Sequence, residues 1–173
     1  MSMLVRDATE DDAAACAAIY APYVTDTAIT FECEPPSVAE MARRMAAAQG
    51  THAWLVLEEE QRVVGYAYGG LFRAREAWSW SCEVSVYLQT GRRRSGAGRA
   101  LYEALLARLA GRGYRTAVAS MTLPNEASEG LHRAMGFEPV GVYPRIGWKF
   151  GTWHDVAFAQ RALGADGPPA ALE

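Results

Sequence analysis

Residues 91–101 read GRRRSGAGRAL and place three consecutive arginines ahead of two glycines and a helix-like run. Before this stretch, residues 79–88 alternate apolar and polar side chains, which predicts a strand. After it, leucines at helical spacing predict a helix that ends near residue 111. Glycines allow a tight turn, and the first turn of a helix offers unpaired N–H groups with partial positive charge. The strand–loop–helix pattern therefore predicts an anion site that suits pyrophosphate.

Three phosphate motifs compete for this loop. The Walker pattern G-x-x-x-x-G-K-[S/T] does not occur in the chain, and the dinucleotide fingerprint begins at Gly96 but is not completed after Gly98. The pattern [Q/R]-x-x-G-x-[G/A] is matched by Arg93, Gly96 and Gly98. A solvated helix N-terminus that happens to carry arginines is the alternative left open by the loop alone.

Composition narrows the class of protein. The chain has 173 residues, half of them hydrophobic, and a formal net charge of −3, which argues against a general nucleic-acid binder. The first residues lack the layout of a signal peptide, and no apolar run is long enough to cross a bilayer. The three cysteines lack metal-ligand spacing. We expect a cytoplasmic protein with reduced thiols, no metal, and no nucleic-acid or membrane partner.

The remaining patterns predict a single α+β (α/β) domain over residues 1–163, followed by a flexible tail over residues 164–173. The predicted order is β-α-α-β-β-β-α-β-α-β-β. Strands are expected at 3–8, 53–59, 62–70, 79–88, 115–121, 139–146 and 152–162, and helices at 9–24, 37–50, 96–111 and 125–135. Residues 28–36 are expected to be extended. The strand, helix and strand between residues 79 and 121 form a crossover, which implies local parallel pairing.

Several segments in the same order resemble one family. They are VRDATEDDAAACAAIYAPYV (5–24), EVSVYL (83–88), the glycine–arginine loop, LPNEASEGLHRAMGF (123–137) and GWKFGTWHDVAF (147–158). Together they resemble the GNAT N-acetyltransferase superfamily, in particular its phosphinothricin acetyltransferase branch, over roughly residues 4–162. The resemblance implies a mixed, twisted sheet of about seven strands with helices on both faces. It also implies a central splay that holds coenzyme A.

The resemblance also assigns residues to acetyl-CoA, which would serve as co-substrate. Val86, Tyr87 and Leu88 would offer backbone groups to the pantetheine arm, and Asn125 would hydrogen-bond the same arm or simply cap a helix. Ser128 fits the helix that follows, where a structural role is favoured over binding. The pyrophosphate would be held, mainly by backbone N–H groups, by the loop residues Arg93, Arg94, Ser95, Gly96, Ala97, Gly98 and Arg99.

Two residues are candidates for the chemistry of acetyl transfer. An amine must lose a proton as it attacks a thioester, and Glu83 resembles the family's glutamate beside the thioester path. The chain departs from the usual pattern by carrying Val84 where serine is common, and a solvent-facing glutamate is the alternative. His132 stands where many members have a tyrosine that protonates the thiolate. A structural role for His132 in its helix is equally favoured.

Four further residues are candidates for the acceptor site. Arg73 and Arg75 align with basic residues of the branch and suit a carboxylate, phosphinate or sulfonyl group, although arginines in a loop are often only solvated. Phe31 and Trp78 would wall the pocket, or else pack in the protein interior. The resemblance gives the segment from Lys149 to Asp155 the place of a pocket wall near a dimer contact, without a chemical role.

The predicted function is transfer of the acetyl group of acetyl-CoA to the primary amine of a small, acidic, amino-acid-like molecule. The compounds implied by the resemblance are phosphinothricin, methionine sulfoximine and methionine sulfone, attacked directly in a ternary complex by a protein that forms a homodimer. One alternative is acetylation of a protein N-terminus or lysine, which would need an open groove. Another is a non-catalytic sensor that binds coenzyme A.

Overall fold

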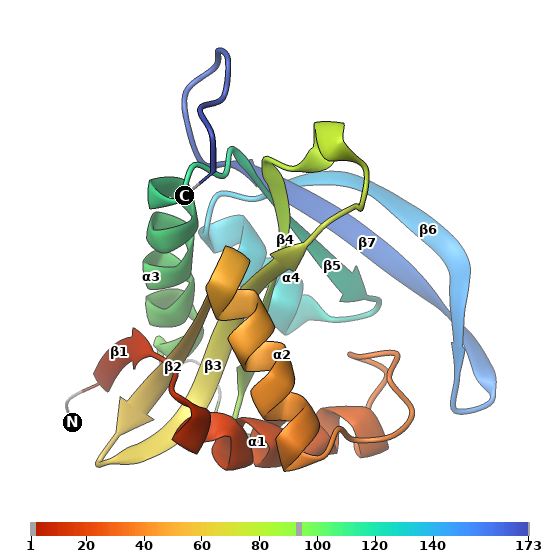
Figure 1. Ribbon diagram of the computed structural model, residues 1–173. Helices are drawn as coiled ribbons and strands as arrows, with labels where there is room; N and C mark the ends of the chain where they lie inside the picture. Colours follow the sequence, from red (N-terminus) through yellow and green to blue (C-terminus); the bar gives the residue numbers. More distant parts are fainter. Residues whose placement is uncertain (1–2, 93–94, 173) are drawn as a thin grey trace.

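The protein is described from a computed structural model over residues 3–92 and 95–172 (Figure 1). The helices and strands follow one another in the predicted order, with a 3-10 turn before α1 and another before β4. Their bounds are β1 (Met3–Asp7), α1 (Ala13–Asp26), α2 (Val38–Thr51), β2 (Ala53–Glu59), β3 (Arg62–Leu71), β4 (Ser81–Leu88), α3 (Ala97–Gly111), β5 (Thr116–Thr122), α4 (Glu126–Ala134), β6 (Glu138–Lys149) and β7 (Thr152–Ala162).

One mixed sheet contains the seven described strands, in the order β1-β2-β3-β4-β5-β7-β6. Every neighbouring pair is antiparallel except β4 and β5, which are parallel, as the crossover predicts. This parallel pairing covers only Ser81–Glu83 of β4 against Thr116–Val118 of β5. Because both strands continue for several residues beyond these pairs, they separate at the middle of the sheet. The predicted mixed sheet with a central splay is thus confirmed.

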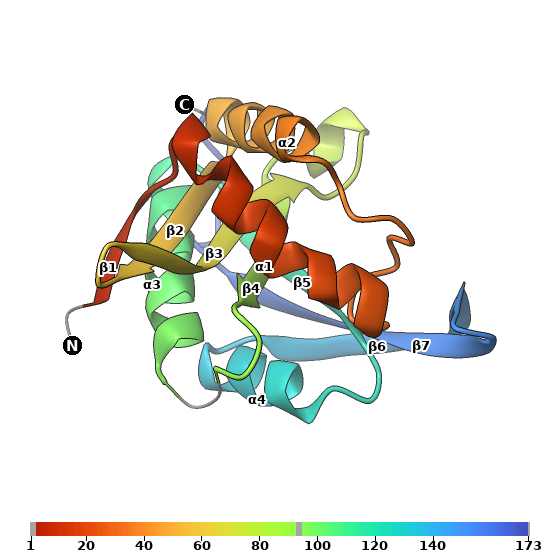
Figure 2. The same cartoon turned by 90° about the horizontal axis from the view of Figure 1, so that it is seen from below.

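Helices cover both faces of the sheet (Figure 2). Alternate residues of a strand point to opposite faces, so β2 sends Leu55 and Leu57 into the core beneath α3, and Trp54 and Val56 into the core beneath α1 and α2. The α3 side also receives the leucines that marked the predicted helix. Two apolar cores, one on each face, therefore fix the position of the splayed strands between them.

Helix α2 ends one residue later than the sequence predicts. Gly50 was expected to close it, but the helix continues through Thr51. The reason is a tertiary contact, since the Arg112 guanidinium donates to the carbonyl oxygens of Gln49 at 2.9 Å and Gly50 at 3.1 Å. An arginine after α3 thus satisfies carbonyls that a glycine cap would otherwise satisfy.

Two other segments differ from the expectation. Residues 28–36, expected to be extended, belong to no helix or strand; they contain bends at 28–30 and 33–34 and connect α1 to α2 as an irregular loop. Strands β6 and β7 extend to a turn of only two residues, Phe150 and Gly151, both with positive φ. The resulting hairpin is long and reaches past the rest of the sheet (Figure 1).

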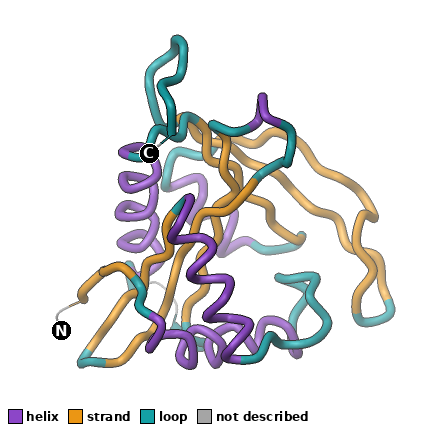
Figure 3. The backbone as a smooth tube through the Cα atoms, in the orientation of Figure 1, coloured by secondary structure: helices purple, strands orange, loops and turns teal. Residues whose placement is uncertain are grey.

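The segment after β7 folds back on the domain, and the flexibility expected of residues 164–173 stays a prediction. Trp80 Nε1 donates to the carbonyl oxygen of Ala170 at 2.8 Å, and Arg115 Nη1 donates to that of Ala165 at 2.9 Å. Figure 3 shows this loop returning to the end of α3, where Leu172 lies near Gly113. Among the described residues, the helices are all too short or too polar to cross a membrane.

Candidate functional site

The site begins where β4 and β5 part. Residues 84–88 of β4 keep their pairing with β3, from Val84 opposite Gly69 to Leu88 opposite Gly65, but lose β5 on the other side. A cavity of about 50 Å³ lies in the gap, and we call it the splay cavity. Its walls come from β4, β5, α3 and α4, together with Ile29, and include Val86, Tyr87, Asn125, Ser128 and His132.

A larger cavity of about 460 Å³, here called the outer cavity, opens beside the first. The two share Ser85 and Tyr87 of β4 and Ser120 and Thr122 of β5 as lining residues, together with Ile29. A molecule in the gap between the strands and another in the outer cavity would therefore meet at these side chains.

Glu83 lies in the outer cavity, one hydrogen bond away from Ser120, which lines both spaces. It is the last residue of β4 that pairs with β5, and its side chain lines the outer cavity. Ser120 Oγ donates a hydrogen bond to Glu83 Oε1 at 2.8 Å. Sequence analysis missed Ser120, although the predicted parallel pairing of the two strands was the signal that could have placed it beside Glu83.

The glycine–arginine loop leads into α3, but Arg93 and Arg94 lie outside the described residues. Gly96 is the N-terminal cap of α3 with φ +80°, a left-handed conformation that favours glycine. Gly98 allows close packing, because a Cβ there would lie 3.1 Å from Cδ2 of Leu131 on α4 and the leucine would have to shift by a few tenths of an ångström. The loop thus brings the first turn of α3 against α4, with its leading amides facing away from the helix.

The other loop residues are held differently. Ser95 Oγ accepts a hydrogen bond from the Ala97 amide at 3.4 Å, which satisfies one amide of the first turn. Arg99 is more than half exposed, and its guanidinium lies 3.9 Å from the Glu103 carboxylate. Arg92 forms an ion pair at 2.6 Å with Glu59 at the end of β2. This ion pair ties the start of the loop to the neighbouring hairpin.

Asn125 and His132 anchor the two ends of α4. Asn125 caps the helix, with Oδ1 accepting from the Ser128 amide at 3.1 Å, and it also lines the splay cavity. His132 is buried, with Nδ1 at 2.7 Å from the Ser128 carbonyl oxygen and Nε2 at 2.9 Å from the Tyr102 hydroxyl. A carbonyl oxygen only accepts, so Nδ1 carries the proton and Nε2 accepts from Tyr102.

Burial favours the neutral form of the His132 imidazole. It lowers the pKa of His132, and the hydrogen bond to the Ser128 carbonyl opposes this shift in part. The role of His132 as a proton donor stays a prediction. Tyr102, which sequence analysis missed, lines the same cavity from α3, and its position four residues after Gly98 was the signal that it faces α4.

The predicted acceptor residues divide into two groups. Arg73 and Phe31 line the outer cavity with Glu83. Arg75 is exposed at the start of the 3-10 turn, and Trp78 packs on Phe72 with ring centroids 5.3 Å apart. Neither Arg75 nor Trp78 is among the residues that line the cavity.

The carboxyl end of β4 is fixed by aromatic residues that sequence analysis missed. The Tyr23 hydroxyl donates to the Leu88 carbonyl oxygen at 2.6 Å. Tyr87 packs edge-on against Tyr20 and Tyr23, with ring centroids 4.9 and 5.1 Å away. The Leu88 carbonyl oxygen therefore already accepts one hydrogen bond within the protein. Leu88 is not among the residues that line the splay cavity.

Lys149, to which the sequence analysis gave no chemical role, is buried and connects β6 to the end of α1 and the segment that follows it. Its side chain is only 5% exposed, and Nζ donates to the carbonyl oxygens of Val24 and Thr30, each at 2.8 Å. Val24 lies in the last turn of α1, where carbonyls lack intrahelical partners and a cation is favourable. Burial lowers the pKa of the Lys149 ammonium.

The chemistry of this arrangement follows from its parts. The open side of β4 offers peptide groups to an extended ligand that itself contains amides, much as an edge strand would. The Glu83 carboxylate in the outer cavity is a group that can accept a proton. Within residues 3–92 and 95–172, no group of three or more His, Cys, Asp or Glu side chains is arranged to hold a metal ion.

Comparisons with known proteins agree with this geometry. A family model described as "Acetyltransferase (GNAT) domain" matches residues 5–158. The phosphinothricin N-acetyltransferase of Streptomyces viridochromogenes is 37% identical over 165 residues, which cover 95% of this chain and 90% of the relative. The L-methionine sulfoximine/L-methionine sulfone acetyltransferase of Pseudomonas paraeruginosa is 36% identical over 168 residues, which cover 94% of this chain and 96% of the relative.

A solved structure shares the fold over nearly the same length. The crystal structure of a GNAT superfamily phosphinothricin acetyltransferase from Sinorhizobium meliloti, in complex with acetyl-CoA, has a TM-score of 0.90 and 38% sequence identity. It covers 95% of this chain and 90% of its own. The family model, the curated relatives and this structure all match most of the chain. The chain therefore belongs to the GNAT acetyltransferase family.

Proposed function

We propose that this protein transfers the acetyl group of acetyl-CoA to the primary amine of a small acidic amino acid or analogue. The observation that carries the proposal is the open side of β4 beyond Glu83, with the Glu83 carboxylate in the outer cavity next to that opening. Relatives named for acetylating phosphinothricin and the methionine sulfoximine/sulfone pair support the substrate class.

The residues of the splay fit acetyl-CoA, which would bring an acetyl group activated as a thioester. Peptide groups of Val86 and Tyr87 would pair with the amides of the pantetheine arm, and the Asn125 side chain lies along the same gap. The first turn of α3 after Gly96 would receive the pyrophosphate, because its amides and the helix dipole both favour an anion. The loop arginines would add charge at the rim.

Glu83 would take the proton that the acceptor amine loses as it attacks, either directly or through a water molecule. The hydrogen bond from Ser120 holds Oε1 of the carboxylate in the outer cavity, and Oε2 would then accept the proton of the acceptor amine. A base positioned in this way contributes roughly 10²- to 10⁴-fold to a rate. Arg73 would bind the acidic end of the acceptor, which orients its amine toward Glu83.

The test is to mix the protein with acetyl-CoA and each of L-phosphinothricin, L-methionine sulfoximine and L-methionine sulfone, and to measure release of free thiol. We expect thiol release that depends on both protein and amine, together with the N-acetyl product by mass spectrometry. Acetyl-CoA binding without acetylation of any primary amine would refute the proposal. Acetylation of peptides but not of these amino acids would favour the protein-directed alternative.

A variant separates an enzyme from a coenzyme A sensor. Glu83→Gln should lower kcat about 10²-fold or more, with the KM for acetyl-CoA changed by less than about twofold. Glu76→Gln is the matched control, since Glu76 is exposed on the 3-10 turn and does not line the cavity. Equal rates for Glu83→Gln and the control would remove Glu83 from the proposed chemistry.

We further propose that the protein is a homodimer that uses the β6–β7 hairpin. This hairpin carries large apolar side chains that are about half exposed or more, and a concentration of exposed apolar side chains is typical of interaction surfaces. They are Val140, Val142, Tyr143, Ile146, Trp148, Phe150 and Trp153. A cytoplasmic location is proposed as well, because the three cysteines are free thiols, which suits a reducing compartment.

A further inference from the structure

The irregular segment between α1 and α2 forms part of the outer cavity. Ile29, Thr30 and Phe31 line this cavity, although the segment has no helix or strand of its own to hold it in place. Loops of this length are usually mobile unless side chains anchor them. The position of the cavity wall therefore depends on contacts that the segment makes with its neighbours.

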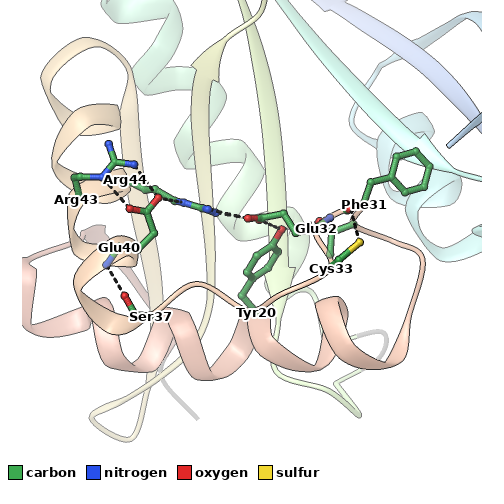
Figure 4. Close-up of polar contacts among 9 residues, drawn as sticks. Tyr20, Phe31, Glu32, Cys33, Ser37, Glu40, Arg43 and Arg44 are labelled. Carbon is green, nitrogen blue, oxygen red and sulfur yellow. Dashed lines mark hydrogen bonds and ion pairs between the residues drawn. The ribbon is translucent and has the colours of Figure 1, made fainter. Parts of the chain in front are cut away.

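A chain of polar contacts supplies one anchor (Figure 4). The Tyr20 hydroxyl donates to Glu32 Oε2 at 2.5 Å and lies 2.6 Å from Thr30 Oγ1. Arg44 of α2 grips the same carboxylate with both ends of its guanidinium, Nη1 to Oε2 at 2.9 Å and Nη2 to Oε1 at 2.7 Å. A bidentate pair of this kind fixes geometry as well as distance.

Arg44 is itself held by a second carboxylate on its own helix. Its Nε donates to Glu40 Oε1 at 2.8 Å, one turn earlier on α2. Arg44 thus connects α2 to the segment that carries Phe31, through Nε on one side and Nη1 and Nη2 on the other (Figure 4). The hydrogen bonds from Arg44 lower the pKa of Glu32, so the carboxylate stays charged at neutral pH.

A third cavity lies on the other side of this network. It has a volume of about 340 Å³ and is lined by α2 and β3, and we call it the α2 cavity. Tyr20 and Tyr68 line both this cavity and the outer cavity, and Arg44 lines the α2 cavity. The network of Tyr20, Glu32 and Arg44 therefore stands at the boundary between the two spaces.

We propose that the Tyr20–Glu32–Arg44 network is a specificity device that holds the wall of the outer cavity closed against the α2 cavity and so limits the length of the acceptor side chain. This inference rests on the proposed function, because it takes the outer cavity as the acceptor site. Glu32 and Arg44 act as positioning residues, since their contacts are with the wall and not with the reacting atoms.

The exposure of the pair argues for a role in geometry rather than stability. The Glu32 and Arg44 side chains are each 35% exposed. Ion pairs this exposed contribute little to the free energy of unfolding, typically below about 1 kcal/mol. Variants of either residue should therefore fold, so their effect on acceptor choice can be measured.

The test compares Glu32→Ala and Arg44→Ala with Glu40→Ala. The control removes a carboxylate that bonds the same arginine but leaves the contact with the wall in place. The probes are L-methionine sulfone and its S-butyl homologue, each with acetyl-CoA. One extra or missing methylene in a confined pocket typically changes kcat/KM by about tenfold or more.

We expect the ratio of kcat/KM for the short over the long acceptor to fall about tenfold in Glu32→Ala and in Arg44→Ala, and less than about twofold in Glu40→Ala. The KM for acetyl-CoA should stay unchanged in all three. The double variant Glu32→Ala/Arg44→Ala should match either single variant, because the two residues act through one contact. An unchanged ratio in Glu32→Ala overturns the proposal.

A second readout does not depend on acetylation. Amide hydrogen exchange at residues 29–32 should be faster in Glu32→Ala than in the wild type, whereas Glu40→Ala should leave it unchanged. If the wild type acetylates no primary amine at all, the proposed function fails, and exchange alone decides whether the network holds the wall. Unchanged exchange in Glu32→Ala overturns the proposal as well.

Discussion

Replacement of Lys149 by methionine should measurably destabilise the protein. The ammonium donates to the carbonyl oxygens of Val24 and Thr30, and the last turn of α1 contains no basic residue of its own. Each carbonyl left without a donor costs about 1–3 kcal/mol, which sums to about 2–6 kcal/mol for the two. Methionine fills the same space and removes the cost of burying a charge, so the net loss should lie near about 2 kcal/mol.

The assay is urea denaturation at pH 7 for Lys149→Met beside Arg43→Met. Arg43 makes its ion pair on the exposed surface of α2, so its variant should change the free energy of unfolding by less than about 0.5 kcal/mol. For a chain of this length, 2 kcal/mol corresponds to a decrease in Tm of about 4–8 °C. Equal stability of the two variants would refute the view that Lys149 caps α1 and anchors the cavity wall.

Three further perturbations test other parts of the structure. Burial lowers the pKa of both His52 and His132 below the usual 6.5, so unfolding takes up protons as the pH falls below 6.5. The free energy of unfolding, measured by urea denaturation, should therefore decline from pH 7 to 5.5, by at most about 1.4 kcal/mol per pH unit for each histidine. A flat profile would contradict this. Gly147→Ala places a Cβ 2.2 Å from the Phe31 ring, so the ring must shift. The KM for the acceptor should then rise about tenfold, while the KM for acetyl-CoA stays constant. An unchanged acceptor KM would count against Phe31 as a wall residue. Trp148→Glu should convert a dimer to a monomer in sedimentation experiments, and a monomeric wild type would refute the proposed interface.

Most of the fold was predictable because its signals are local. Alternation marked β4, leucine spacing marked α3, and Asn125 caps α4 as its position before a helix-like run predicts. The crossover order then implied the parallel pairing, and the resemblance supplied the splay. Each of these features depends on neighbours in the sequence, where periodicity and capping rules apply.

The parts that sequence reasoning missed depend on residues far apart in the chain. Gly50 does not end α2, because Arg112 donates to its carbonyl from 62 positions later. Lys149 reaches Val24 across 125 positions, and no spacing rule connects the two. Ser120 and Tyr102 are different, because the predicted parallel pairing and the spacing from Gly98 were signals that could have placed them. Contacts such as those of Arg112 and Lys149 become visible only with the fold.

The short contact between β4 and β5 has a mechanical consequence. Three residue pairs form the seam between a half-sheet of β1 to β4 and a half-sheet of β5 to β7. A ligand that bonds to both sides of the gap would add contacts between the two half-sheets and so stabilise their association. The two half-sheets should then unfold as one cooperative unit when the ligand is bound, and separate most readily along this line when it is not.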